Sequence, residues 1–218
     1  RRHTRFRNVT GVQTCALPIL ALHRGFFQYQ DQQRQGVWQP HAQRQAREVP
    51  VLVLGLGLLG TQVAQALSSL GYPVTAWRLH AGRTAPPGVQ AVQGMTALQH
   101  ALSQAQVVIN LLPLTALTRG LINADFLARL PPGAGLVNLA RGAHVVDADL
   151  LQALDAGHLA HAVLDVFATE PLPLDHRFWH HPRVTVLPHV AALTDPRTAC
   201  RSEEHTSELQ SRFGISYA

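Results

Sequence analysis

The sequence is poor in cysteine, lacks lysine and contains no long hydrophobic run. Of its 2 cysteines, Cys15 lies in a segment that we consider non-native below, so Cys200 alone remains and a disulfide framework is excluded. No apolar run is long enough to cross a bilayer, which excludes a membrane-spanning helix. We therefore expect a cytoplasmic protein without a membrane partner.

Positive charge is present but is not concentrated in the way that nucleic-acid binding requires. The formal net charge is +5, yet residues 20–200 contain 12 Arg against 10 Asp and Glu. All 18 basic residues are Arg, which indicates a GC-rich coding genome rather than a function. No basic stripe with interleaved aromatic residues is present, so we expect no nucleic-acid partner.

The two ends of the chain are related through their coding DNA. One set of codons for residues 201–211 (RSEEHTSELQS) gives, as its reverse complement in a shifted frame, residues 9–19 (VTGVQTCALPI). Two unrelated protein segments would not encode each other's antisense strand, whereas an adaptor ligated to both ends of a DNA fragment would. We therefore expect residues 1–19 and 201–218 to be non-native, and we leave them out of the predicted fold.

The stretch VLVLGLGLLG at residues 51–60 is an apolar run that passes through glycines into a helical pattern. Such a run suits a strand that is buried on both faces, as in a parallel sheet. Gly55 would form the tight turn, Gly57 would let the backbone approach a pyrophosphate, and Gly60 would let the helix pack close to the strand. The new helix would point its free N–H groups at the phosphates.

Strands and helices alternate along the chain. Apolar runs predict strands at residues 51–54, 73–77, 107–112, 135–139, 160–166 and 184–187. Periodic patterns and breakers predict helices at residues 20–37, 58–70, 96–103, 123–130 and 147–156, with a Gly/Pro-rich loop at residues 80–88. This alternation predicts an α/β fold with a doubly wound parallel sheet of the Rossmann type.

Three polar residues follow predicted strands, at the edge where an open α/β sheet binds its ligands. Arg141 lies in NLARG, Glu170 in LDVFATEPLP and His189 in PHVAA. Taken singly, they could be a solvated arginine, an ordinary turn residue and a strand-end histidine. Their occurrence together in a chain with a glycine turn favours a catalytic site.

With these motifs in this order after GLGLLG, residues 20–200 resemble the D-isomer-specific 2-hydroxyacid dehydrogenases, most closely their glyoxylate/hydroxypyruvate reductase branch. The resemblance implies that Arg141 holds a small 2-oxo or 2-hydroxy acid by its carboxylate and carbonyl, for which a forked cation is suited. It also implies that His189 donates the proton, while Glu170 orients the imidazole and favours its charged form. The nicotinamide would supply the hydride.

The resemblance also implies a cofactor groove. Asp165 is expected to hold the nicotinamide amide, and the Leu112-Pro113 turn and Thr118 are expected to line the groove. The expected cofactor-binding residues are Gly55, Gly57, Leu58, Leu59, Gly60, Arg78, Arg83, Leu112, Pro113, Thr118, Ala140, Asp165 and Ala191.

The second predicted strand indicates which cofactor is preferred. NAD-binding chains usually carry an acid about 20 residues beyond the glycines, to hold the ribose hydroxyls. Here the strand ends WRLH, with Arg78 and Arg83 nearby and no acid. Cationic groups suit a 2′-phosphate, so NADP(H) is favoured over NAD(H), unless both arginines are merely solvated.

In the resembled family, the substrate domain is built from residues before the cofactor domain and a closing helix at the end. We therefore expect residues 20–47 to be a remnant of that domain and the crossover, and residues 48–200 to be the NAD(P)-binding domain. With the substrate domain largely missing, little turnover is expected, and the full-length protein is expected to be a homodimer. The alternative is a non-catalytic dinucleotide-binding module, such as a sensor or corepressor, which would not need the complete catalytic set.

Histidine is frequent, and several histidines lie close together in the sequence. The candidates for a metal site are His158, His161, His176, His180 and His181. None has a partnering Cys or acid at a recognised ligand spacing, so we expect no metal.

Overall fold

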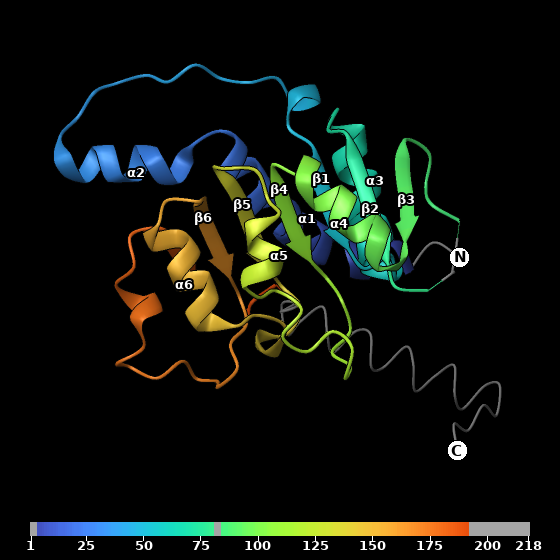
Figure 1. Ribbon diagram of the computed structural model, residues 1–218. Helices are drawn as coiled ribbons and strands as arrows, with labels where there is room; N and C mark the ends of the chain where they lie inside the picture. The colour runs from blue at the N-terminus through green and yellow to red at the C-terminus, as the bar shows by residue number, and fades with distance from the viewer. Residues whose placement is uncertain (1–3, 81–83, 192–218) are drawn as a thin grey trace.

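A parallel sheet forms the centre of the molecule (Figure 1). In the computed structural model, which describes residues 4–80 and 84–191, the sheet has seven strands in the order β3-β2-β1-β4-β5-β6-β7. These strands are β1 (Val51–Leu54), β2 (Val74–Arg78), β3 (Val89–Gln93), β4 (Val107–Asn110), β5 (Ala134–Asn138), β6 (Leu159–Leu164) and β7 (Val184–Val186). The predicted doubly wound α/β fold is confirmed.

Helices cover both faces of the sheet (Figure 1). The covering helices are α1 (Thr4–His23), α3 (Leu58–Ser69), α4 (Gly94–Gln104), α5 (Ala124–Ala128) and α6 (Asp147–Asp155), whereas α2 (Phe26–Gln35) has no buried residue. Short 3₁₀ turns are η1 (Ala46–Glu48), η2 (Gly142–His144) and η3 (Arg177–Trp179). Side chains of α1 and α3 join one hydrophobic core, and those of α4, α5 and α6 join the other. No helix among the described residues is long and apolar enough to cross a membrane.

The central strand β1 supplies both cores. Successive side chains of a strand point to opposite faces, and all four residues of β1 are buried. Leu52 and Leu54 belong to the core beneath α4, α5 and α6, whereas Val51 and Val53 belong to the core beneath α1 and α3. A continuous apolar run is therefore what this position in the sheet requires.

One edge of the sheet differs from the prediction. Residues 89–93 form strand β3, which pairs in parallel with β2 and which the sequence analysis did not predict. Gln90 and Gln93 interrupt the apolar pattern, and no residue of this strand is fully buried. An edge strand of this kind depends on hydrogen bonds to its neighbour rather than on a hydrophobic signal in its own sequence.

The amino-terminal region also differs from the prediction. The helix predicted at residues 20–37 is two helices, because the chain turns at Gly25, which has φ +65°. Sequence reasoning assigned no part in the fold to residues 1–19, but Cys15 and Ile19 of α1 are fully buried in the core against α3. Burial, and then the nearby Asp165 carboxylate, raise the pKa of the Cys15 thiol to about 12.

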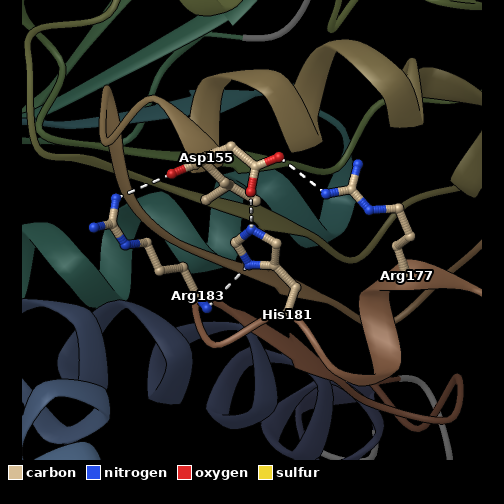
Figure 2. Close-up of polar contacts among 5 residues, drawn as sticks. Asp155, Arg177, His181 and Arg183 are labelled. Atoms are coloured by element: carbon tan, nitrogen blue, oxygen red, sulfur yellow. Dashed lines mark hydrogen bonds and ion pairs between the residues drawn. The ribbon is translucent and has the colours of Figure 1, made fainter.

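A polar cluster ties the segment between β6 and β7 to the end of helix α6 (Figure 2). Asp155 accepts a hydrogen bond from Arg177 at 3.0 Å and lies 3.1 Å from Nε2 of His181. These two contacts lower the pKa of Asp155. Arg183 donates from its main chain to Nδ1 of His181 and from its guanidinium to the Leu154 carbonyl. The cluster lies near the amino ends of β6 and β7, on the opposite edge of the sheet from the residues described below.

One histidine lies inside the protein. His161 on β6 is 7% exposed, stacks on Phe27 with ring centroids 4.1 Å apart, and has Nε2 2.8 Å from Oγ1 of Thr185. Burial lowers the pKa of His161 from 6.5 to about 4. The folded protein therefore favours the neutral imidazole.

We predict an acid-sensitive component of stability from His161. Because its folded pKa lies below its unfolded pKa, the stabilisation is present above pH 6.5 and is lost as the pH falls towards 4. Between pH 7 and pH 4.5 this histidine should account for about 2 kcal/mol of lost unfolding free energy. Urea unfolding at both pH values should show a smaller acid loss for His161→Gln than for the wild type. The control His100→Gln, on the exposed face of α4, should behave as the wild type does; equal acid losses in all three proteins would refute the prediction.

Candidate active site

The turn between β1 and α3 brings three stretches of backbone together. Gly55 has φ +102°, and a Cβ there would lie 2.8 Å from the carbonyl oxygen of Leu111. A Cβ at Gly60 would lie 1.9 Å from the Gly55 carbonyl oxygen, so the helix can approach the strand this closely only with glycine. A Cβ at Gly57 would meet nothing within 4 Å. The backbone at Gly57 is thus open to the approach of another molecule.

The first turn of α3 faces this open backbone. Gly57 is the N-cap residue, and no side chain among the described residues caps the helix. Uncapped N–H groups at a helix N-terminus bind phosphate well. Leu58 and Leu59 are 59% and 37% exposed, so the helix presents apolar side chains beside these groups. The turn lies at the carboxyl end of β1, where the sheet changes its winding direction and where ligands bind in such folds.

The turn after β4 lies next to the glycine turn. Leu112 is buried and Pro113 is exposed. Thr118 is 4% exposed; its hydroxyl donates to the Pro113 carbonyl at 2.8 Å and accepts from the Thr115 N–H at 2.8 Å. These bonds give residues 112–118 a defined shape, with the predicted groove residues Leu112, Pro113 and Thr118 in one turn.

The loop after β5 carries Arg141. Its guanidinium donates to the Ala140 carbonyl at 2.6 Å, and Ala140 itself is buried. A Cβ at Gly142 would lie 1.8 Å from the carbonyl carbon of Phe167, so this loop packs directly on the backbone of the loop after β6. Gly142 therefore brings Arg141 near Glu170, and the Arg141 charge contributes to the electrostatic environment of that carboxylate.

Glu170 and His189 form a hydrogen-bonded pair. Oε2 of Glu170 lies 2.7 Å from Nδ1 of His189, and the two side chains are 36% and 46% exposed. The other oxygen, Oε1, accepts from the Phe167 N–H at 2.9 Å. This backbone bond, and then the bond to His189, lower the pKa of Glu170. A carboxylate that binds one ring nitrogen of a histidine orients the ring and leaves Nε2 for proton transfer.

Asp165 anchors the chain that follows His189. It is fully buried at the end of β6, and its two oxygens accept from the main-chain N–H groups of Val190 at 2.7 Å and Ala191 at 2.9 Å. His189 has φ 55°, a backbone conformation that residues other than glycine seldom adopt. The two hydrogen bonds that Asp165 accepts hold the chain immediately after His189. Ala191 is also buried in the core beneath α1 and α3.

An apolar hollow of about 430 Å³ adjoins the Glu170–His189 pair. It is lined by Phe167, Glu170, Pro171, Leu172, Trp179, Val186, Pro188 and His189. Trp179 is 44% exposed and donates its indole N–H to the Pro173 carbonyl at 2.8 Å. Arg141 does not line this hollow.

The residues predicted to select the cofactor are only partly described. Arg78 is the last residue of β2, partly buried and on the same edge of the sheet as the glycine turn. Arg83 lies outside the described residues. Among residues 4–80 and 84–191, no three His, Cys, Asp or Glu side chains are grouped as metal ligands would be.

Sequence reasoning missed four residues that shape the site. Asn110 and Asn138 end β4 and β5 fully buried and are joined by a 3.0 Å hydrogen bond. Gly142 permits the close loop contact, and His144 is fully buried beneath Arg141. An asparagine at the end of each of two apolar strands was the one available signal, because buried amides need partners.

Comparison with known proteins agrees with this geometry. Residues 17–191 match the model of the D-isomer specific 2-hydroxyacid dehydrogenase, NAD binding domain. The chain belongs to this family.

Its relatives include named reductases. Glyoxylate/hydroxypyruvate reductase A of Salmonella typhi is 45% identical over 184 residues, which cover 84% of this chain and 58% of that protein. The chain thus spans a little over half the length of this relative. A D-isomer specific 2-hydroxyacid dehydrogenase from Xanthobacter autotrophicus Py2, solved with NADPH and MES, superposes with a TM-score of 0.87 at 37% identity, covering 96% of this chain and 86% of that one.

A second solved structure has the same fold. The NADPH-dependent glyoxylate/hydroxypyruvate reductase of Sinorhizobium meliloti, in complex with NADP and sulfate, superposes with a TM-score of 0.87 at 32% identity. The match covers 97% of this chain and 67% of that one. The resemblance to 2-hydroxyacid dehydrogenases that the motifs indicated is therefore confirmed at the level of the family and its NAD(P)-binding domain.

We predict that Asp165→Asn loosens the turn after His189. An amide has a single acceptor oxygen, so one of the two main-chain N–H groups now bound by Asp165 would lose its partner and face an N–H donor. The expected loss of unfolding free energy is about 2 kcal/mol, since a buried hydrogen bond to a charged group is removed. Urea unfolding measures this loss, with the exposed Asp175→Asn as a matched control expected to change little. Equal stability of both variants would contradict the prediction.

Proposed function

We propose that this chain is the cofactor-binding part of an NADP(H)-dependent reductase of a small 2-oxo acid, of the glyoxylate or hydroxypyruvate type. The observation that carries the proposal is the Glu170–His189 pair, which lies at the carboxyl edge of the sheet beside the Arg141 loop. A dinucleotide fits the glycine turn, because the open backbone at Gly57 and the uncapped start of α3 leave room and donors for a pyrophosphate.

The side chains of this site suit the reduction of a carbonyl. The bound nicotinamide supplies the hydride. Arg141 would bind the carboxylate of the oxo acid, since a guanidinium forms paired hydrogen bonds with carboxylates. His189 would pass a proton from Nε2 to the carbonyl oxygen, and Glu170 would hold the ring through Nδ1 and stabilise the imidazolium. Leu112, Pro113 and Thr118 would line the groove. Asp165 is fully buried and both its oxygens are bonded to main-chain N–H groups, so it would reach the nicotinamide amide only if the chain after His189 moves.

The preference for NADP(H) rests on Arg78. It ends β2 on the same edge of the sheet as the glycine turn, where an acid would be expected in an NAD-binding chain. The relatives from Xanthobacter and Sinorhizobium are described with NADPH and NADP, which supports the same choice. Family resemblance also supports a homodimer for the full-length protein and a cytoplasmic location, and both stay predictions.

The alternative is a dinucleotide-binding module without catalysis, such as a sensor. The joined Glu170–His189 pair favours an enzyme, because a sensor needs only the groove. This pair is partly exposed, whereas hydride transfer benefits from the exclusion of water. Since the Salmonella relative extends well beyond the matched part, we expect the 218-residue chain to bind NADPH and to turn over slowly or not at all.

The first test is a fluorescence titration of the chain with NADPH, followed by glyoxylate and absorbance at 340 nm. Gly57→Ala should fold as the wild type does, because its Cβ has free space, but should weaken NADPH binding by about tenfold or more, since the methyl group would enter the phosphate site. Gly60→Ala is the matched variant that should lose the fold itself. If NADPH does not bind, or binds Gly57→Ala equally well, the assigned cofactor site is wrong.

A second prediction concerns cofactor choice. Arg78→Gln should weaken NADPH binding by about tenfold, the usual value of a hydrogen bond to a charged group, and should change NADH binding less than about twofold. The same titration with both cofactors gives the two ratios. Arg119→Gln, an exposed arginine after the β4 turn, is the control and should leave both affinities unchanged. A parallel loss for both cofactors in Arg78→Gln would show that this residue does not read the 2′-phosphate.

A further inference from the structure

His144 is a buried titratable residue that the proposed reaction does not use. It ends the 3₁₀ turn η2 and is fully buried. Nδ1 lies 3.0 Å from the carbonyl oxygen of Arg141, and Nε2 lies 3.3 Å from that of Pro113. Both neighbours only accept hydrogen bonds, so a neutral ring donates to one of them at a time and an imidazolium donates to both.

The two carbonyl groups belong to different walls of the site. Pro113 lies in the turn after β4 that would line the cofactor groove, and Arg141 lies in the loop after β5 that would bind the substrate carboxylate. The ring of His144 fills the space between them, and its own main-chain carbonyl is fixed by the N–H of Ile122 at 2.9 Å. The imidazole is therefore held in place and can act as a rigid spacer.

Two asparagines complete a ring of hydrogen bonds around the same loops. The Asn138 amide donates to the Arg141 carbonyl at 3.2 Å, and its oxygen accepts from Asn110 at 3.0 Å. The Asn110 oxygen in turn accepts from the N–H of Leu112 at 3.2 Å, the residue before Pro113. The asparagines thus join the ends of the two strands, and His144 joins the loops that those strands carry.

We propose that His144 is a positioning residue that couples the cofactor groove to the Arg141 loop. The coupling rests on the proposed function, in which the Leu112–Thr118 turn contacts the cofactor and Arg141 contacts the oxo acid. Because the ring contacts the carbonyl of each loop, a shift of one loop is transmitted through His144 to the other. Each ligand should then raise the affinity for the other, and by the same factor.

The first experiment needs no ligand. Amide hydrogen exchange is compared for the wild type, His144→Leu, which has no donor, and His144→Gln, whose amide keeps donor hydrogens. The matched control is His158→Leu, because His158 also contacts a backbone carbonyl, that of Leu127 at 3.0 Å, far from these loops in the fold. In His144→Leu, exchange should rise about tenfold in both residues 112–118 and residues 139–142.

His144→Gln should restore much of the protection, and His158→Leu should leave both segments as in the wild type. Faster exchange in only one of the two segments would contradict the proposal that His144 joins the loops. Equal exchange rates in His144→Gln and His144→Leu would contradict it as well. This experiment decides whether His144 joins the loops, whatever the protein binds.

The second experiment measures the coupling itself. The dissociation constant of NADPH is measured with and without saturating oxamate, a non-reacting analogue of a 2-oxo acid. In the wild type, oxamate should tighten NADPH binding by about fivefold or more, whereas in His144→Leu the ratio should approach one. Because the readout is the ratio of the NADPH dissociation constants with and without oxamate, it reports the coupling even where His144→Leu changes the NADPH affinity itself.

A wild-type ratio of one, or an unchanged ratio in His144→Leu, would overturn the coupling. If the wild type does not bind NADPH at all, the proposed function is wrong, and the coupling between NADPH and the oxo acid is refuted as well. The exchange experiment would then still report separately on the bridge between the loops.

Discussion

The close approach of helix α3 to strand β1 is the constraint on which the rest of the site depends. With no side chain at Gly60, the helix packs against the carbonyl of Gly55, and with none at Gly55 the turn packs against the chain after β4. These contacts are between backbone atoms, which cannot move aside as a flexible side chain can. They fix the positions of the helix N-terminus, the glycine backbone and the β4 turn relative to one another, and these are the groups that we propose to bind a dinucleotide.

The remaining walls of the site are held by buried polar groups at the ends of strands. Asn110 and Asn138 end β4 and β5, Asp165 directly follows β6, and each is fully buried. The asparagines bond to main-chain groups of the loops that follow their strands and to each other, and Asp165 bonds to main-chain groups of the chain that follows β7. A buried polar group that loses its partner is costly, so these residues transfer the rigidity of the sheet to the loops. Arg141 and His189 are exposed, but the chain on either side of them is fixed.

The two edges of the sheet have different tasks. The carboxyl edge gathers glycine backbone, uncapped helix N–H groups, an arginine and the carboxylate–histidine pair. The amino edge carries the Asp155 cluster, which joins α6 to the returning chain before β7. Its Asp155–Arg177 ion pair is exposed and adds little to stability, whereas the His181 side chain is only 7% exposed. The cluster holds the long segment between β6 and β7, which carries Glu170 and most of the lining of the apolar hollow.

The sequence by itself determined the fold class, six of the seven strands of the described sheet, the glycine turn and the three residues of the candidate catalytic set. These features have local signals, because apolar runs, glycines and motifs are read along the chain. Tertiary structure alone decided the edge strand β3, the break at Gly25, the burial of Cys15 and Ile19, and the roles of Gly142 and His144. Apart from the break at Gly25, each of these depends on a neighbour distant in the sequence. The neighbour is β2 for the strand, α3 for Cys15 and Ile19, the backbone after β6 for Gly142 and the β4 turn for His144. A residue's partner across space leaves no mark in its own local pattern, and that is the physical reason they could not be predicted.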